Sequence, residues 1–451
     1  MCSAEQSDFL LGRPILEKAR RFTDLSPSRI ATHTVDLSLL TTIYGFTFGD
    51  QDDLGNIDSD DVESTSLLTL EPGDLPVHVL VSNCSFMNSS LVGLTALAGL
   101  RLQVINSRAF GVATSIHGML DGTSLQVSNF VCDGTLRLES LSLVPEGEDQ
   151  FGTAFISNSM FGSIEAQFNQ ASLLFTNTLS NGLTLKGDEG RAKFSNCEFN
   201  IHKSALITGS NFYSLANCDF IIHRGAGSRS KAVTALTLAW PESEDAKGYI
   251  SLASCQFLMS DNSDNIQLTD TFIGIVSVGT SSSQSELSIK DCRFGSGLHK
   301  GILFYKCGLR ATIHGILLES RVGIEVLAHP TAEALLRIGH VKLSRLADDE
   351  GVAYLSFLSD SRRIKITHLS TTLTNEENII HGPPIGLINS LGQRLIYGTS
   401  EPRASDAGLK GDIWRLTTPR VGQDYEWVCV QSGTSTSNST QWAALSRIHQ
   451  E

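Results

Sequence analysis

A short phrase recurs along the middle of this chain and limits the folds open to it. The phrase reads apolar, any, apolar, any, Asn, Cys or Ser, any, Phe, and nine copies are visible. The copies are VLVSNCSF, LQVINSRAF, LQVSNFVC, FISNSMF, LLFTNTLS, AKFSNCEF, YSLANCDF, ISLASCQF and LSIKDCRF. Such repetition indicates a repeat architecture, in which each unit buries its apolar side against the next.

The spacing of the copies gives the size of the unit. The Asn position, called the turn position below, is held by Asn83, Asn106, Asn129, Asn158, Asn177, Asn196, Asn217, Ser254 and Asp291. Successive differences are 23, 23, 29, 19, 19, 21, 37 and 37 residues. Fainter copies place His314, His340 and His368 at the same position. A coil of about 20 residues with loop insertions is typical of a β-solenoid.

The apolar residues change phase at the turn position. Before Asn83, the inward set is Val79 and Val81; after it, the inward set is Cys84 and Phe86. One residue in the left-handed conformation produces such a change, and Asn tolerates that conformation. We therefore predict two strands meeting at a tight bend, with the Asn residues of successive coils stacked in a buried ladder.

This pattern resembles the pectate-lyase-like parallel β-helices, which carry an asparagine ladder at the same turn. The resemblance covers roughly residues 65 to 385 and implies an all-β fold, a right-handed single-stranded parallel β-helix with three sheets. It says little about function, because the fold hosts lyases, hydrolases, epimerases, adhesins and virion spikes.

The nine cysteines fit the same pattern. Five of them share the inward position directly after the turn: Cys84, Cys197, Cys218, Cys255 and Cys292. No CxxC pair is present, so neither a zinc site nor a redox motif is indicated. We expect a buried column of thiols without a disulfide framework.

Residues 1–64 lack the repeat and form a predicted cap or attachment segment. The spacing of Pro14 to Phe22 favours a short amphipathic helix that covers the open end of the solenoid. The acidic stretch from Gly49 to Asn56 has part of a calcium-loop pattern, but Leu54 occupies a ligand position. A solvated acidic loop is the favoured interpretation.

The predicted β-helix comprises residues 65–390. The amino-acid composition then changes, and residues 398–451 form a predicted small β module. It contains GDIWRLTTP, WVCV and a final Trp442. This resembles the short module that follows β-helices in many phage tailspikes. Trp427 and Trp442 have two open interpretations: the core of a very small domain, or a platform on which sugar rings stack.

Composition and motifs exclude several function classes. A formal charge of -14 and a pI near 5.3 argue against nucleic acid or an anionic membrane as partner. Membrane insertion is not expected, because no apolar run approaches the roughly 18 residues of a span. No export signal is visible, so we expect synthesis in the cytoplasm of a host. No nucleotide loop, HExxH or GxSxG occurs, and we expect neither metal nor cofactor.

The candidate chemistry lies on the outward face. Two residues after the turn position, the outward column reads Ser85, Arg108, Val131, Met160, Leu179, Glu198, Asp219, Gln256 and Arg293. Its middle is nearly duplicated, as NCEFNIHKSA and NCDFIIHRGA. Glu198 is thus predicted to stack on Asp219, and His202 on His223.

The duplicated coils have a catalytic and a structural interpretation. As a site, Glu198 and Asp219 supply the paired carboxylates of a glycosidase, while His202 and His223 supply acid or base for a lyase. Candidate substrate-binding residues are Lys203, Arg224, Arg293, Trp427 and Trp442. As structure, the duplication only repeats a solvent face whose cations offset the carboxylate charge.

Three functions stay open. The leading hypothesis is a tailspike-like receptor-binding protein of a virion that binds, and in one version depolymerises, a bacterial surface polysaccharide. It implies a homotrimer whose N-terminal segment contacts other virion proteins. The alternatives are a free extracellular polysaccharide lyase or glycoside hydrolase, and a non-enzymatic structural appendage or adhesin.

Overall fold

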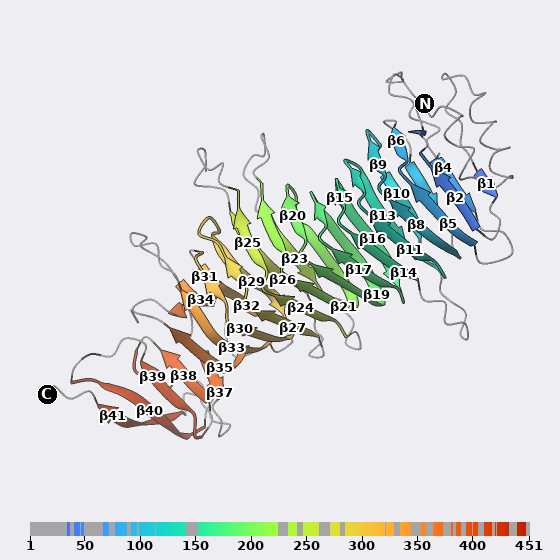
Figure 1. The fold of residues 1–451 in the computed structure, drawn as a ribbon. Coiled ribbons are helices and arrows are strands. Elements are labelled where there is room, and N and C mark those ends of the chain that lie inside the picture. Colours follow the sequence, from blue (N-terminus) through green and yellow to red (C-terminus); the bar gives the residue numbers. More distant parts are fainter. Residues whose placement is uncertain are drawn as a thin grey trace, which may run out of the picture. The chain divides into compact units, whose positions relative to one another are not determined.

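A computed structural model describes most of the repeat region and parts of both ends (Figure 1). The described residues are 34–36, 40–45, 47–48, 66–71, 77–87, 92–96, 99–112, 114–140, 152–223, 233–240, 247–260, 271–279, 285–320, 322–328, 334–343, 353–357, 364–372, 380–381, 385–388, 394–398, 400–404, 410–416, 420, 422–432 and 440–447. The predicted N-terminal helix and the acidic loop lie outside them. Within these residues every regular element is a strand, and no helix is long and apolar enough to cross a membrane.

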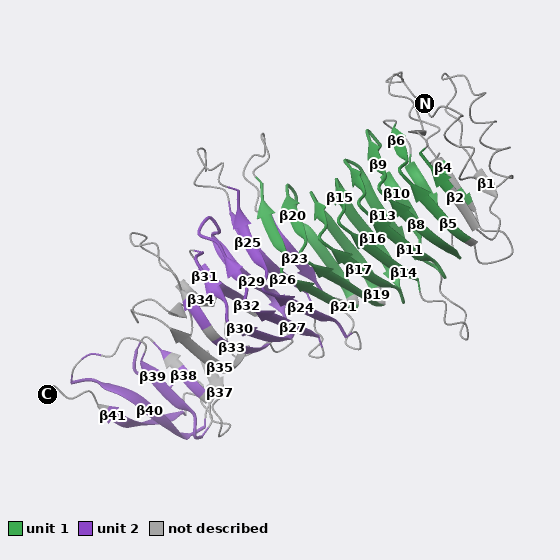
Figure 2. Ribbon diagram, in the orientation of Figure 1, with its two compact units in different colours: residues 1–223 green, residues 224–451 purple. Residues whose placement is uncertain are grey.

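The chain divides into two compact units, residues 1–223 and 224–451 (Figure 2). Both have the architecture of a right-handed parallel β-helix, as predicted. Each coil contributes one strand to each of three sheets. The first sheet precedes the turn position, the second follows it, and the third completes the coil.

In unit 1, consecutive strands alternate among the three sheets, and each strand up to β16 pairs in parallel with the strand three places on. From β17 to β20 the partner is two places on, because two later strands each span two sheets. The first sheet contains β2 (Leu40–Tyr44), β5 (Val77–Ser82), β8 (Leu100–Ile105), β11 (Ser124–Ser128), β14 (Thr153–Ser157) and β17 (Ser172–Thr176). The second contains β3 (Thr47–Phe48), β6 (Ser85–Met87), β9 (Arg108–Phe110), β12 (Val131–Cys132), β15 (Met160–Phe161), β18 (Leu179–Ser180), β20 (Glu198–Ile201) and β22 (Asp219–Ile222). The third contains β1 (Thr34–Asp36), β4 (Ser66–Glu71), β7 (Val92–Ala96), β10 (Thr114–Met119), β13 (Thr135–Glu139) and β16 (Ser163–Asn169).

Two long strands of unit 1, β19 (Leu183–Ser195) and β21 (Ala205–Ala216), pass from the third sheet into the first. One coil precedes the first copy of the sequence phrase, because β2 pairs with β5 and β3 with β6. Gly45 takes the turn position there, with φ of 74°.

Unit 2 repeats the arrangement. Its first sheet contains β24 (Tyr249–Ala253), β27 (Glu286–Lys290), β30 (Arg310–His314), β33 (Ala334–Leu343), β35 (Ile364–Thr372) and β37 (Ile385–Ile388). Its second contains β25 (Gln256–Met259), β28 (Arg293–Phe294) and β31 (Leu317–Leu318), and the end of β33 pairs with β31. Its third contains β23 (Val233–Ala239), β26 (Phe272–Val278), β29 (Lys300–Cys307), β32 (Val322–Ala328), β34 (Ala353–Phe357) and β36 (Ile380–His381).

The predicted left-handed residue is confirmed at every copy of the phrase. From Asn83 to Asn217, φ lies between 48° and 54°, and Ser254 and Asp291 have φ of 54° and 53°. The fainter copies are partly wrong. Gly315, with φ of 68°, takes the turn position predicted for His314. The prediction for His368 is also wrong, because that residue pairs with Arg337 inside the first sheet.

The asparagine ladder exists but is not buried. Nδ2 of Asn177 donates to Oδ1 of Asn158 at 3.0 Å, and Nδ2 of Asn196 donates to Oδ1 of Asn177 at 3.3 Å. These side chains are exposed, contrary to our expectation. The reason is geometric: a left-handed residue at an outer corner directs its side chain away from the core, so the ladder lies along the edge of the solenoid.

The inward columns are confirmed. The five predicted thiols are buried, and so are Phe199, Phe220, Phe257 and Phe294. The rings of Phe199 and Phe220 stack with centroids 4.9 Å apart in unit 1, and those of Phe257 and Phe294 do so at 4.9 Å in unit 2. Stacked pairs of this kind contribute to the core of each unit.

The small inward residue after the turn also closes that turn, which its apolar role did not predict. The Cys197 thiol donates to the carbonyl of Ser195 at 3.4 Å, and the Ser159 hydroxyl donates to the carbonyl of Ser157 at 2.8 Å. Both reach the residue just before the left-handed one. Cys, Ser and Thr exchange at this position because each is small and each donates a hydrogen bond.

The C-terminal module is a small sheet that ends unit 2. β38 (Arg394–Gly398) pairs in parallel with β39 (Ile413–Leu416), which pairs antiparallel with β40 (Asp424–Gln431). The last strand, β41 (Gln441–Arg447), pairs antiparallel with β40. Its core consists of Ile396, Trp414, Leu416 and Trp427, with Trp442 packed against them.

Candidate functional site

The carboxylates singled out from the sequence lie on adjacent strands of the second sheet in unit 1. Glu198 on β20 pairs directly with Asp219 on β22, and both side chains are half-buried. The column predicted from the phrase is also present as strand partners in unit 1, but Ser85 at its start is buried rather than outward. Its strand partners follow in the order Ser85, Arg108, Val131, Met160, Leu179, Glu198 and Asp219.

A third side chain, Asn200, joins this pair to the histidines. Its Nδ2 donates to Oε1 of Glu198 at 3.2 Å, and its Oδ1 lies 2.7 Å from Nε2 of His223. Since Oδ1 only accepts, His223 carries its proton on Nε2, which leaves Nδ1 as an acceptor. Sequence reasoning missed Asn200. The available signal was its difference from Ile221, its strand partner in the otherwise duplicated coil.

The rings of the two histidines lie side by side, with their planes tilted by 31°. The ring centroids of His202 and His223 lie 5.1 Å apart, and His202 is the more exposed. Burial lowers the pKa of His223, the charge of nearby His202 lowers it further, and the Glu198 carboxylate opposes both. His223 is therefore neutral near pH 7, the form in which a histidine accepts a proton.

The predicted binding residues are distributed over both units. Lys203 is exposed and follows His202 in unit 1, whereas Arg224 lies outside the described residues. Arg293 is on β28 in unit 2, where it forms a two-nitrogen ion pair with Glu319 at 3.0 to 3.3 Å. Its guanidinium is held by a carboxylate, which leaves less of its charge for a ligand.

The two tryptophans belong to the C-terminal module. Trp427 is only 7% exposed, and Trp442 is half-buried with its ring 5.5 Å from that of Trp414 in an edge-to-face contact. This packing favours the core interpretation, since a ring that stacks on sugar needs an open face. Sugar binding by Trp427 and Trp442 stays a prediction.

The cluster around Asn200 offers two kinds of chemistry. A pair of neighbouring carboxyls provides the two acid-base groups that glycoside hydrolysis uses. A neutral histidine beside them is a general base. No group of three His, Cys, Asp or Glu side chains suited to a metal ion occurs in the described part of the chain.

Comparison with known proteins gave no relative. No protein-family model matches the chain, and neither a curated protein nor a solved structure does so.

Proposed function

We propose that this chain is a tailspike-like receptor-binding protein that binds a bacterial surface polysaccharide and cleaves it at Glu198 and Asp219. The observation that carries the proposal is the direct pairing of these two acids on neighbouring coils, with Asn200 linking Glu198 to His223. In the proposed particle the protein is a homotrimer whose N-terminal segment contacts other virion proteins.

The spacing of the coils supports the choice of Glu198 and Asp219. Adjacent parallel strands lie about 4.8 Å apart, and the carboxyls of retaining glycosidases lie about 5 to 5.5 Å apart. Paired acids in register are thus compatible with a double displacement at a glycosidic bond. In the lyase alternative, neutral His223 removes the proton next to a sugar carboxylate.

The test replaces each acid by its amide. Glu198→Gln and Asp219→Asn should each abolish release of new chain ends from a capsule or O-antigen that the wild type degrades, because shape is kept while the ionisable group is lost. Binding should persist. Glu286→Gln is the matched control, since that carboxylate is exposed on β27 in unit 2.

The product identifies the chemistry. An unsaturated sugar that absorbs ultraviolet light indicates a lyase, and a reducing end without it indicates a hydrolase. Full activity in both amide variants would reject the site. A wild type that binds bacterial cells but cleaves no polysaccharide would favour the adhesin, an alternative suggested by the uncharged side chains Val131, Met160 and Leu179 in the same column.

A further inference from the structure

Three apolar side chains stand outward on consecutive coils beside the acid pair. Val131 pairs with Met160, and Met160 with Leu179, whose next partner is Glu198. Val131 is 43% exposed and Met160 is 41% exposed, while Leu179 is half-buried. We call these three residues the apolar ladder.

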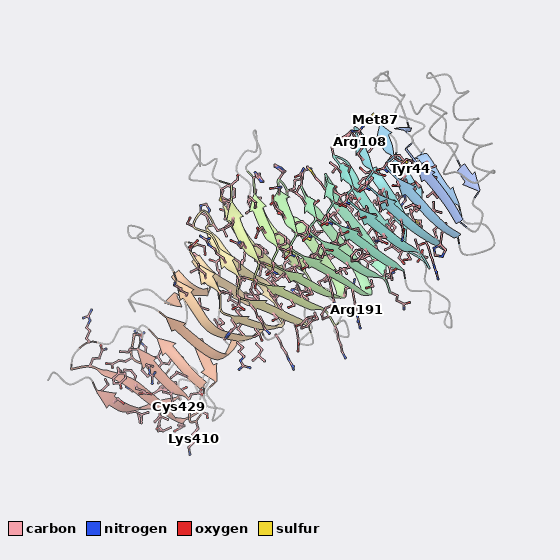
Figure 3. All side chains as sticks on the ribbon, in the orientation of Figure 1. Tyr44, Met87, Arg108, Arg191, Lys410 and Cys429 are labelled. Carbon is pink, nitrogen blue, oxygen red and sulfur yellow. The ribbon has the colours of Figure 1, made fainter. Side chains whose placement is uncertain are left out.

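The ladder has an aromatic neighbour. Phe110 is 42% exposed and lies on β9, two residues after Arg108, which pairs with Val131. Figure 3 labels Arg108 at this end of the second sheet, close to Met87, the strand partner of Phe110. Exposed apolar side chains that gather on one face of a protein are candidates for a contact surface.

We propose, on the basis of the function proposed above, that the apolar ladder is the subsite next to the acid pair and selects uncharged sugars with apolar groups, such as deoxy or O-acetylated units. The ladder and the pair form one column, so a polymer lying along it contacts both. Sugar rings and their methyl or acetyl groups pack on Val131, Met160 and Leu179, whose side chains offer a hydroxyl nothing stronger than the weakly accepting thioether of Met160.

Charge selects against acidic sugars at the same place. Glu198 and Asp219 stand at one end of the ladder, and the chain carries a net charge of -14. A uronic acid placed between the ladder and the pair would lie close to these acidic side chains, which is unfavourable for its own negative charge. Among the described residues of this column in unit 1, Arg108 is the one cation; it lies at the opposite end of the ladder and donates from Nε to Ser85 Oγ at 2.9 Å.

The experiment compares three polysaccharides: an O-acetylated neutral polymer, its alkali-treated form without acetyl groups, and a uronate-containing polymer. The wild type should bind the first most tightly. The double variant Met160→Gln with Leu179→Gln should bind it roughly tenfold more weakly, as expected for the loss of apolar contact. Phe155→Gln is the control, because Phe155 is 39% exposed but lies on the first sheet.

Each other outcome overturns the inference in a recognisable way. Preference for the uronate polymer, or unchanged binding by the double variant, would reject the ladder as subsite and leave the proposed function standing. A fall in molecular mass of the double variant would show that another copy of the chain covers the ladder. Failure of the wild type to bind any bacterial polysaccharide would reject the proposed function itself.

Discussion

At the bend between the first and second sheets, a single left-handed residue reverses which side chains face the core. Asn dominates this position because its short amide tolerates positive φ and reaches a neighbouring coil, as Asn196 does toward Asn177 on the preceding one. For most other residues except glycine, the left-handed conformation at this position costs about 1 to 2 kcal/mol.

The first prediction follows from that penalty. Asn196→Ala should lower the free energy of unfolding by about 1 to 2 kcal/mol, whereas Asn196→Gly should cost less because glycine adopts positive φ freely. Chemical denaturation of both variants measures the difference. A loss with glycine equal to that with alanine would mean that the side-chain hydrogen bond, rather than backbone conformation, determines the preference.

The second prediction concerns the titration of His223. Its pKa in the folded protein should lie below 6.5, its ordinary value. Replacing His202 by Asn should raise the pKa of His223, because a neighbouring positive charge is removed. Glu198→Gln should lower it, because the favourable carboxylate is lost. Two-dimensional NMR of the imidazole signals measures each shift, and shifts of opposite sign would contradict the geometry.

The sign of the pH effect on stability follows. Since the folded pKa of His223 is depressed, the unfolded chain binds more protons at mildly acidic pH. The contribution of neutral His223 to stability is therefore complete above about pH 6.5 and is lost as the pH falls through the lowered folded value.

At the scale of the strand, the inward columns carry the stability of each unit. Phe220 is fully buried against Phe199, so Phe220→Ala should destabilise unit 1 by about 3 to 5 kcal/mol. Phe212→Ala is a suitable control because Phe212, on β21, is 37% exposed. A similar loss from both variants in thermal unfolding would argue against the column as the main source of stability.

Thiol chemistry gives a fourth prediction. Every cysteine in the described residues is buried, and burial raises the pKa of Cys132 to about 11 and that of Cys307 to about 12. These groups stay protonated at pH 8 and are poor nucleophiles. Iodoacetamide should therefore label them only after denaturation. Rapid labelling of Cys132 in the native protein would contradict its burial.

The coils could be predicted well from the sequence because two independent features indicate the register: the phase of the apolar residues and the identity of the turn residue. The prediction failed where one cue was weak. Around His314 the turn residue is Gly315, and the apolar spacing alone allowed an error of one position. The exposure of the asparagine ladder depends on the direction in which a left-handed residue points its side chain, and the periodicity of the sequence carries no information about that direction. Asn200 was missed because its role depends on a contact with the next coil, at His223.

At the scale of the whole molecule, the described surface of unit 1 places the candidate site next to the apolar ladder. The described residues of this unit contain one such acid pair. A single weak polysaccharide site becomes an effective receptor contact when several copies act together, because the second binding event is then intramolecular. The receptor-binding proposal therefore requires an oligomer, whereas a free enzyme works as one chain.

The final prediction is the molecular mass in solution. Light scattering should give three times the chain mass of 48.7 kDa, and the value should not change over a wide range of concentrations if the trimer is obligate. The Met160→Gln, Leu179→Gln double variant should keep that mass, because the ladder is proposed to face sugar rather than a subunit. A mass of 48.7 kDa would contradict the spike and favour the free enzyme. In that case the amide variants of Glu198 and Asp219 still test catalysis, since the acid pair lies within one unit of a single chain.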